Sequence, residues 1–374
     1  MNTLPKISVV LVDDSSVIRA ALSRILQTDS GIEVIGSVVN GEMAVSIAKS
    51  KKPNIIILDV EMPVMDGLTA LPQILQHSPD TKVIMCSSLT AKGGDITIKA
   101  MALGAVECLV KPSSAQETGP GSAFQTTLIN LVKTLGGTRH ATKELTQPPS
   151  SSATPSKLSH ADISAVAQKR NQGTIILRND PSDYSGVPKI LAIGSSTGGP
   201  QALFKVVEDL GTLEIPVVIT QHMPETFTKI LADHLQQKCG VQSHEGADGM
   251  PVENGHYYIA PGGKHMLFKE RNGQLFIKLN DGPEENFCKP AVDPMMRSLI
   301  EIYGEKILCA ILTGMGQDGL LGARALVENN GRVIAQDEAS SVVWGMPGAV
   351  ATDGICSAVM PLNDIGGWLK RAVS

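Results

Sequence analysis

Residues 55–59 read Ile-Ile-Ile-Leu-Asp, four apolar side chains followed at once by a carboxylate. A strand with one solvent-exposed face alternates apolar and polar side chains, so this uniformly apolar run predicts a strand that is buried on both faces. Strands of this kind are typical of parallel sheets that helices cover on both sides. The stretch therefore indicates an α/β fold in the N-terminal part of the chain, with Asp59 at the carboxyl end of its strand.

Similar apolar runs precede and follow this strand at intervals that leave room for helices. Between the first two runs, Ile18, Leu22 and Leu26 recur at helical spacing. Such an alternation of strands and helices predicts a doubly wound parallel sheet, (βα)5 in chain order. The expected strands are Ile7–Val12, Val34–Val39, Ile55–Leu58, Val83–Cys86 and Val106–Val110.

Composition divides the chain into three segments, 1–125, 126–186 and 187–374. Residues 147–156 read Gln-Pro-Pro-Ser-Ser-Ser-Ala-Thr-Pro-Ser, which is too poor in apolar side chains to form a core. We therefore expect a partly low-complexity linker over the middle segment, with one helix near Thr127–Leu135. Strand–helix alternation resumes in the third segment and predicts a second doubly wound, Rossmann-like α/β domain. Its expected strands are Ile190–Ile193, Pro216–Thr220, Tyr257–Ala260, Ile307–Leu312 and Arg332–Ala335, with a hairpin over Leu267–Leu279.

The composition of the 374 residues argues against several classes of protein. A net charge of −5 and an aromatic content of 3% do not suit a protein that binds nucleic acid. No apolar run reaches the ~18 residues that span a bilayer, and the N-terminus does not read as a secretory signal. The six cysteines form no Cys-x-x-Cys pair, so neither a zinc site nor a disulfide framework is expected. We expect a soluble cytoplasmic protein that does not insert into membranes.

Polar side chains stand at the carboxyl ends of the expected N-terminal strands. Asp13 and Asp14 follow the first strand and Asp59 ends the third, while Ser87 and Lys111 follow the fourth and fifth. Since the carboxyl ends of parallel strands meet at one edge of the sheet, these groups are expected to converge there. Clustered carboxylates require a hard cation such as Mg²⁺. Capping of the next helix explains any one aspartate by itself, but it does not explain the lysine and the hydroxyl.

The stretch Leu58–Gly67, Leu-Asp-Val-Glu-Met-Pro-Val-Met-Asp-Gly, together with these residues resembles the receiver domain of two-component response regulators. The resemblance implies that Asp59 accepts a phosphoryl group from a histidine kinase. Many receivers carry an aromatic switch residue where this chain has Cys108. The resemblance assigns Mg²⁺ to Asp13, Asp14, Asp59 and the Glu61 carbonyl, and the phosphoryl oxygens to Ser87 and Lys111.

A glycine-rich turn, Gly194-Ser195-Ser196-Thr197-Gly198-Gly199-Pro200, follows the first expected strand of the C-terminal domain. Such a turn before a helix can bind phosphate through backbone N–H groups, although neither Gly-x-Gly-x-x-Gly nor Gly-Lys-Ser/Thr is present. Alternatively, Gly-x-Ser-x-Gly centred on Ser196 fits a nucleophile elbow, in which a sharp turn presents a serine hydroxyl at the sheet edge.

A serine nucleophile requires a base and a third group that orients the base. His222 follows the expected strand Pro216–Thr220 and so falls on the same sheet edge as Ser196; its alternative role is that of a loop-capping imidazole. Asp318 lies in the loop after Ile307–Leu312, where it could instead be the N-cap of the next helix. Together the three side chains form a candidate Ser-His-Asp triad.

The segments around the candidate triad resemble the catalytic domain of chemotaxis protein-glutamate methylesterases, the CheB-type response regulators. The resemblance implies a serine carboxylic-ester hydrolase that acts on glutamyl methyl esters of chemoreceptors, releases methanol and also deamidates glutamine. It further implies a role in chemotaxis adaptation, a chemotaxis histidine kinase as phosphodonor, and no cofactor in the catalytic domain. The matching segments are Gly194–Pro200, Gln221–Pro224, Ile259–Gly263, Leu312–Gly319 and Trp344–Pro347.

In this hypothesis Ser196 is the nucleophile, His222 the base, and Asp318 the acid that orients it. The resemblance implies the Met315 N–H as an oxyanion donor, and Thr197 supports the turn. The alternative hypothesis is a response regulator whose second domain is a non-catalytic module that binds a nucleotide or phosphate or docks on receptors.

Overall fold

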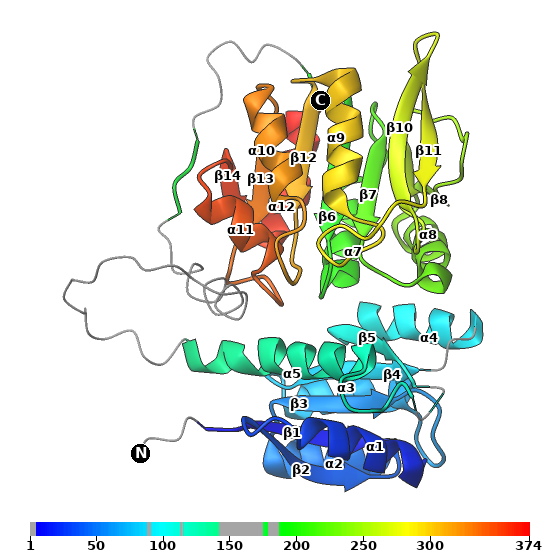
Figure 1. Ribbon diagram of the computed structural model, residues 1–374, viewed down its shortest axis with the longest axis vertical. Helices are drawn as coiled ribbons and strands as arrows, with labels where there is room; N and C mark the ends of the chain where they lie inside the picture. The colour runs from blue at the N-terminus through cyan, green and yellow to red at the C-terminus, as the bar shows by residue number, and fades with distance from the viewer. Residues whose placement is uncertain (1–4, 88–90, 113, 115, 142–174, 179–186) are drawn as a thin grey trace, which may run out of the picture.

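The computed structural model of the protein describes residues 5–87, 91–112, 114, 116–141, 175–178 and 187–374. The described part forms two α/β domains, one above the other in Figure 1. The low-complexity stretch expected at 147–156 lies outside the described residues. Among those residues, no helix is both long and apolar enough to cross a membrane.

The N-terminal domain is a five-stranded parallel sheet in the order β2-β1-β3-β4-β5. β3 is buried along its whole length, as its apolar sequence predicts. The last helix, α5, packs against β1 and α1, so a division of the chain at residue 125 falls just inside this helix. The elements are β1 Ile7–Val12, α1 Ser16–Leu26, β2 Ile32–Val38, α2 Gly41–Lys51, β3 Ile55–Asp59, α3 Gly67–His77, β4 Lys82–Ser87, α4 Ala91–Ala102, β5 Glu107–Val110 and α5 Ala123–Ala141.

The C-terminal domain contains a seven-stranded sheet in the order β14-β13-β12-β6-β7-β9-β8, with every pair parallel. A separate antiparallel hairpin, β10–β11, lies where the sequence predicts one. The elements are β6 Ile190–Ser195, α7 Gly199–Leu210, β7 Val217–Gln221, α8 Glu225–Cys239, β8 Gln242–Glu245, β9 His256–Ile259, β10 His265–Arg271, β11 Gln274–Asn280, α9 Val292–Tyr303, β12 Ile307–Ile311, α10 Leu320–Glu328, β13 Arg332–Gln336, α11 Met346–Thr352, β14 Ala358–Met360 and α12 Leu362–Ala372.

The doubly wound parallel fold expected for both domains is thus confirmed. In the C-terminal domain β6 lies at the centre of the sheet, with β7 on one side and β12 on the other. The direction of chain progression changes between β6 and β12. Ligands of open α/β sheets bind at such switch points, outside the carboxyl ends of the strands. The loops after β6, β7 and β12 meet there.

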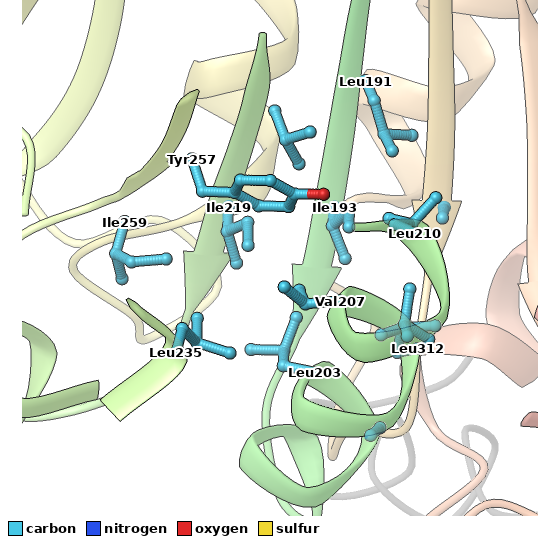
Figure 2. Close-up of a cluster of buried hydrophobic side chains, with 14 of the residues drawn as sticks. Leu191, Ile193, Leu203, Val207, Leu210, Ile219, Leu235, Tyr257, Ile259 and Leu312 are labelled. Atoms are coloured by element: carbon cyan, nitrogen blue, oxygen red, sulfur yellow. The ribbon is translucent and has the colours of Figure 1, made fainter. Parts of the chain in front are cut away.

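Both faces of this sheet carry an apolar core. On the face shown in Figure 2, Leu203 and Val207 of α7 pack over Ile193 of β6 and Ile219 of β7. All four side chains have no solvent-exposed area. Burial of each contributes on the order of 1.5–3 kcal/mol, which fixes α7 on the sheet and with it the turn that precedes the helix.

The domains contact each other through α4 and the neighbouring β5 on one side and α7 and α8 on the other (Figure 1). Ile98 and Met101 of α4 are buried in the core cluster of the C-terminal domain. The amide of Gln201 donates to the carbonyl of Ala105 at 2.6 Å, and His234 Nε2 lies 2.7 Å from an oxygen of Asp95. The interface therefore combines apolar burial with directional polar contacts.

Candidate functional site

Ser196 lies in the sharp turn that joins β6 to α7. Its N–H donates to the carbonyl of Thr313 at 3.0 Å, and the Gly199 N–H donates back to the carbonyl of Ser196 at 2.7 Å. Gly198 has φ +76°, in the left-handed region that favours glycine. Because the N–H groups of Ser196, Gly198 and Gly199 all bond to backbone carbonyls, the turn resembles a nucleophile elbow more than a phosphate-binding loop.

The two adjacent serines of this turn have different environments. Ser195 is fully buried, and its Oγ donates to Gln221 Oε1 at 2.7 Å. The amide nitrogen of Gln221 donates to the carbonyl of Ser196 at 2.9 Å. Gln221 therefore bonds to both serines and stabilises the turn. Ser196 itself is partly exposed. Of the two serines, only Ser196 therefore reaches solvent.

His222 directly follows β7 and lies beside this turn, since its N–H donates to the carbonyl of Ser195 at 3.1 Å. Its Nε2–H donates to Asp318 Oδ2 at 2.8 Å, and the imidazole is only 11% exposed. On the other side of the ring, Cys288 Sγ lies 3.3 Å from Nδ1. Burial lowers the pKa of His222, but Asp318 and Cys288 outweigh it and raise the pKa to about 9.

Asp318 is buried and has four hydrogen-bond donors around its carboxylate. Oδ2 accepts from His222 and from the Val292 N–H at 2.6 Å. Oδ1 accepts from Asn286 Nδ2 at 3.0 Å and from the Asp293 N–H at 3.3 Å. Burial raises the pKa of Asp318, but the hydrogen bond and charge of His222, together with the backbone N–H groups, lower it below its usual value. Asp318 is thus held ionised at the N-terminus of α9.

This arrangement excludes the N-cap alternative for Asp318. The N-cap of α10 is Gly319, which makes no side-chain capping bond, so Asp318 does not cap the helix that follows it. It bonds instead to the first turn of α9, which precedes it in the chain.

Ser196 and His222 lie on the same sheet edge but are not yet hydrogen-bonded to each other. No hydrogen bond of the Ser196 hydroxyl occurs within the described residues. Of the two ring nitrogens of His222, Nε2 is engaged by Asp318, and Nδ1 faces Cys288. Nδ1 is therefore the ring nitrogen that does not bond to Asp318.

Two backbone N–H groups near Ser196 are available to a ligand. Those of Thr197 and Met315 donate no hydrogen bond within the part of the chain that the structure describes. A Cβ at Gly314 would lie 2.8 Å from Ser196 Cβ, so the loop that carries Met315 approaches the serine as closely as it does because residue 314 is a glycine.

The N-terminal domain covers the turn of Ser196. The Val106 carbonyl, next to β5, accepts a hydrogen bond from the Gly198 N–H at 3.0 Å. Glu107 bonds to the side chain of Thr197; burial raises the pKa of Glu107, whereas this bond and the charge of His222 act in the opposite direction. An acidic side chain of one domain therefore lies beside the candidate catalytic residues of the other.

The carboxyl edge of the N-terminal sheet brings its polar residues together as well. Lys111 Nζ lies 2.7 Å from Asp59 Oδ2 and 2.8 Å from Asp13 Oδ2. Side-chain oxygens of Asp13, Asp14 and Asp59 lie within 4.8 Å of one another. Burial raises the pKa of Asp59, and Lys111 partly opposes that rise. Glu61 lies in the loop after β3 with its side chain exposed.

Ser87, at the end of β4, is buried beside this cluster. Its Oγ lies 3.0 Å from Thr97 Oγ1 and 3.6 Å from Cys108 Sγ. Cys108 also packs against the core of the C-terminal domain. The residue at the usual aromatic switch position thus contacts both the carboxylate edge of its own domain and the domain interface.

Sequence reasoning missed four polar residues of the candidate catalytic site: Glu107, Asn286, Cys288 and Asp293. Asn286 donates to both Asp318 and Asp293, each at 3.0 Å. Asp293 is buried beside Asp318, and burial together with that charge raises its pKa. For Asn286 and Cys288 the sequence signal was their position just before α9, because side chains near a helix N-terminus often bond to its free N–H groups.

Residues 191–369 match the CheB methylesterase family, and residues 9–118 match the response regulator receiver domain family. A protein-glutamate methylesterase/protein-glutamine glutaminase of group 2 operon from Rhodospirillum centenum is 47% identical over 369 residues, which cover 97% of this chain and 93% of that protein. The chain belongs to the CheB methylesterase family.

A second full-length relative agrees with membership of the CheB methylesterase family. Protein-glutamate methylesterase/protein-glutamine glutaminase 1 of Paramagnetospirillum magneticum is 47% identical over 98% of this chain and 96% of its own. The CheB methylesterase catalytic domain of Thermotoga maritima, a crystal structure, is 40% identical and covers 49% of this chain and 98% of its own, with a TM-score of 0.48. The identity to the two full-length relatives confirms, over nearly the whole chain, the resemblance predicted from the motifs.

Proposed function

We propose that the protein is a phosphorylation-activated protein-glutamate methylesterase of chemotaxis adaptation. It hydrolyses glutamyl methyl esters on chemoreceptors, releases methanol, and also converts glutamine side chains to glutamate. The observation that carries the proposal is the buried His222–Asp318 hydrogen bond of 2.8 Å beside the turn of Ser196. It occurs in a chain that is 47% identical, over nearly its whole length, to proteins named for this activity.

The hydroxyl of Ser196 attacks the ester carbonyl while His222 takes its proton. Because Nε2 donates to Asp318, the proton goes to Nδ1. The Ser196 hydroxyl therefore displaces the Cys288 thiol from this nitrogen, since Cys288 occupies the position in the covered form. His222 then returns the proton to the departing methoxide, methanol leaves, and a water molecule hydrolyses the acyl-enzyme with His222 again acting as base.

Charge that develops on the carbonyl oxygen requires donors that are already in place. The N–H groups of Thr197 and Met315 fit this role, because neither donates elsewhere in the described part of the chain. One such donor typically contributes about 3 kcal/mol to transition-state stabilisation, or roughly 10²–10³ in rate.

In the N-terminal domain Asp59 accepts a phosphoryl group from a chemotaxis histidine kinase. The carboxylates of Asp13, Asp14 and Asp59 and the Glu61 carbonyl would hold Mg²⁺, which would neutralise charge during phosphoryl transfer. The donor set fits this ion, since three carboxylates gather within 4.8 Å and Lys111 balances only part of their charge. The phosphoryl oxygens then bond to Ser87 and Lys111.

Phosphorylation acts by uncovering the triad. In the present arrangement β5 and its neighbouring carbonyl bond to the turn of Ser196. A change at Asp59 reaches this interface through Ser87 and Cys108, which are 3.6 Å apart. We divide the chain into a receiver domain (1–125), a linker (126–186) whose first residues continue α5 of the receiver domain, and a catalytic domain (187–374). The kinase and the substrate glutamates place the reaction in the cytoplasm, with neither nucleic acid nor membrane insertion involved.

Methanol release from methylated receptor, with and without acetyl phosphate and Mg²⁺, tests the proposal. We expect turnover that acetyl phosphate increases in the wild-type chain but not in D59N, which cannot form the acyl phosphate. Absence of methanol release in both conditions would overturn the esterase assignment. Equal stimulation of wild type and D59N would overturn the phosphorylation step alone.

A further inference from the structure

A tight turn, residues 285–288, lies next to the candidate triad. Glu285 and Cys288 exchange two backbone hydrogen bonds, of 3.1 and 2.9 Å. The two residues between them, Asn286 and Phe287, have φ of 53° and 62°. Two consecutive residues with positive φ define a type I′ turn, in which asparagine is favoured at the first position and glycine at the second. Phe287 thus occupies the position that glycine prefers.

The residues on either side of Phe287 are bound to the triad. Asn286 Nδ2 donates to Asp318 at 3.0 Å, and Cys288 Sγ lies 3.3 Å from His222 Nδ1. Phe287, in contrast, is 97% exposed. The turn is therefore fixed by the catalytic residues, and it holds an aromatic ring in solvent beside them.

Neither the positive φ of Phe287 nor the exposure of its ring stabilises the folded chain. The left-handed backbone strains a residue with a Cβ, and the ring buries almost no surface. Single exposed apolar side chains are common on protein surfaces, but here a glycine would remove both penalties. Backbone strain of this kind clusters at functional sites, and aromatic side chains are enriched among residues that dominate protein interfaces.

We propose that Phe287 is a substrate-contact residue that packs against apolar side chains of the receptor segment bearing the methyl ester, and so positions the ester at Ser196. This inference rests on the proposed function. The N-terminal domain covers the turn of Ser196 but leaves Phe287 exposed. The ring is therefore available to the substrate before the triad itself is uncovered.

The substitution F287G separates this role from a structural one. Glycine is the residue that the turn prefers, so the thermal midpoint of F287G should equal or exceed that of the wild type. With acetyl phosphate, Mg²⁺ and methylated receptor, we expect KM to rise about tenfold or more and kcat to stay within about twofold. F287L should recover part of the lost affinity, because it keeps an apolar side chain. V17A, at a 74% exposed residue on α1, serves as the matched control and should change neither constant.

A binding measurement keeps this test independent of turnover. S196A and S196A/F287G are titrated with the methylated receptor fragment, and the double variant should bind at least about tenfold more weakly. Equal affinities, or an unchanged KM for F287G, would overturn the role of Phe287 while leaving the esterase assignment intact. A lower thermal midpoint would show that the ring packs within the chain. Dimers of the wild type that F287G abolishes would identify a second copy as the partner instead, which also overturns the proposal.

Discussion

Ile98 offers a direct test of whether the receiver domain covers the catalytic site. It lies on α4 of the receiver domain, yet it has no exposed area and belongs to the core cluster that includes Phe227 and Leu231 of α8. The substitution I98A shortens this side chain at the interface. We call the arrangement in which α4 packs on the catalytic domain the covered form, and the arrangement in which this contact is broken the open form. We expect I98A to destabilise the covered form and not the open form, because in the open form the side chain would be exposed to water.

The size of the effect follows from the carbon atoms removed. Isoleucine exceeds alanine by three carbons, and each buried CH₂ contributes about 0.8 kcal/mol, so the covered form loses about 2.4 kcal/mol. At about 1.4 kcal/mol per factor of ten, the covered-to-open ratio falls roughly 50-fold. Starting from a ratio of about 99 to 1, this leaves about 2 to 1. The open fraction without phosphorylation then rises from about 1% to about a third.

The assay is methanol release from methylated receptor in the absence of any phosphodonor. We expect the basal rate of I98A to rise about 30-fold over wild type, and acetyl phosphate to add only about threefold more, as the ratio above requires. The double variant D59N/I98A should show the same raised basal rate, since the effect bypasses phosphorylation. A folded I98A protein, verified by circular dichroism, with a basal rate within twofold of wild type would refute the covering role of α4.

Four further predictions concern the catalytic domain. S196A abolishes methanol release, whereas S195A loses one buried hydrogen bond and keeps activity within about tenfold; equal losses would show that the wrong serine is assigned. The pKa of His222 is raised to about 9 and the neutral imidazole is the base, so kcat/KM should rise with pH up to about 9. In D318N this rise of kcat/KM should occur at lower pH, and kcat should fall by about 10⁴. This pKa exceeds the value of about 6.5 in the unfolded chain, so charged His222 contributes its full amount to the free energy of unfolding below pH ~6.5. The contribution is lost as the pH rises through 9, and urea unfolding at a series of pH values measures the loss. N286A removes a donor to Asp318 and should lower kcat about tenfold at constant KM; an unchanged kcat excludes a positioning role.

The sequence predicted the strands that are buried on both faces, because a run of apolar side chains has no other stable place in a parallel sheet. It did not predict β8 and β14. β8 reads Gln-Ser-His-Glu and lies at the edge of the sheet, where one side of the strand has no neighbour. β14 has only three residues at the opposite edge. Strands at an edge need not be apolar, so periodicity carries little information about them.

The candidate site was predictable where residues follow directly from strand ends. Ser196, His222 and Asp318 each lie in a loop after a central strand, and parallel strands bring such loops together. Asn286 and Cys288 lie instead in a turn with no periodic pattern, and they reach the triad only because Asp318 bonds back to the start of α9. That contact joins residues far apart in the chain and depends on tertiary packing.

The contact between α4 and α8 lies within a single polypeptide, and this has a consequence for the response of the cell. An inhibitor that is tethered to its target acts at an effective concentration that does not depend on the total concentration of the protein. Dilution or overproduction of the protein therefore leaves the ratio of inhibited to active molecules unchanged. The fraction of active molecules is then set by the phosphorylated fraction, and a receiver fragment supplied separately would have to reach the effective concentration of the tethered domain to restore the same inhibition.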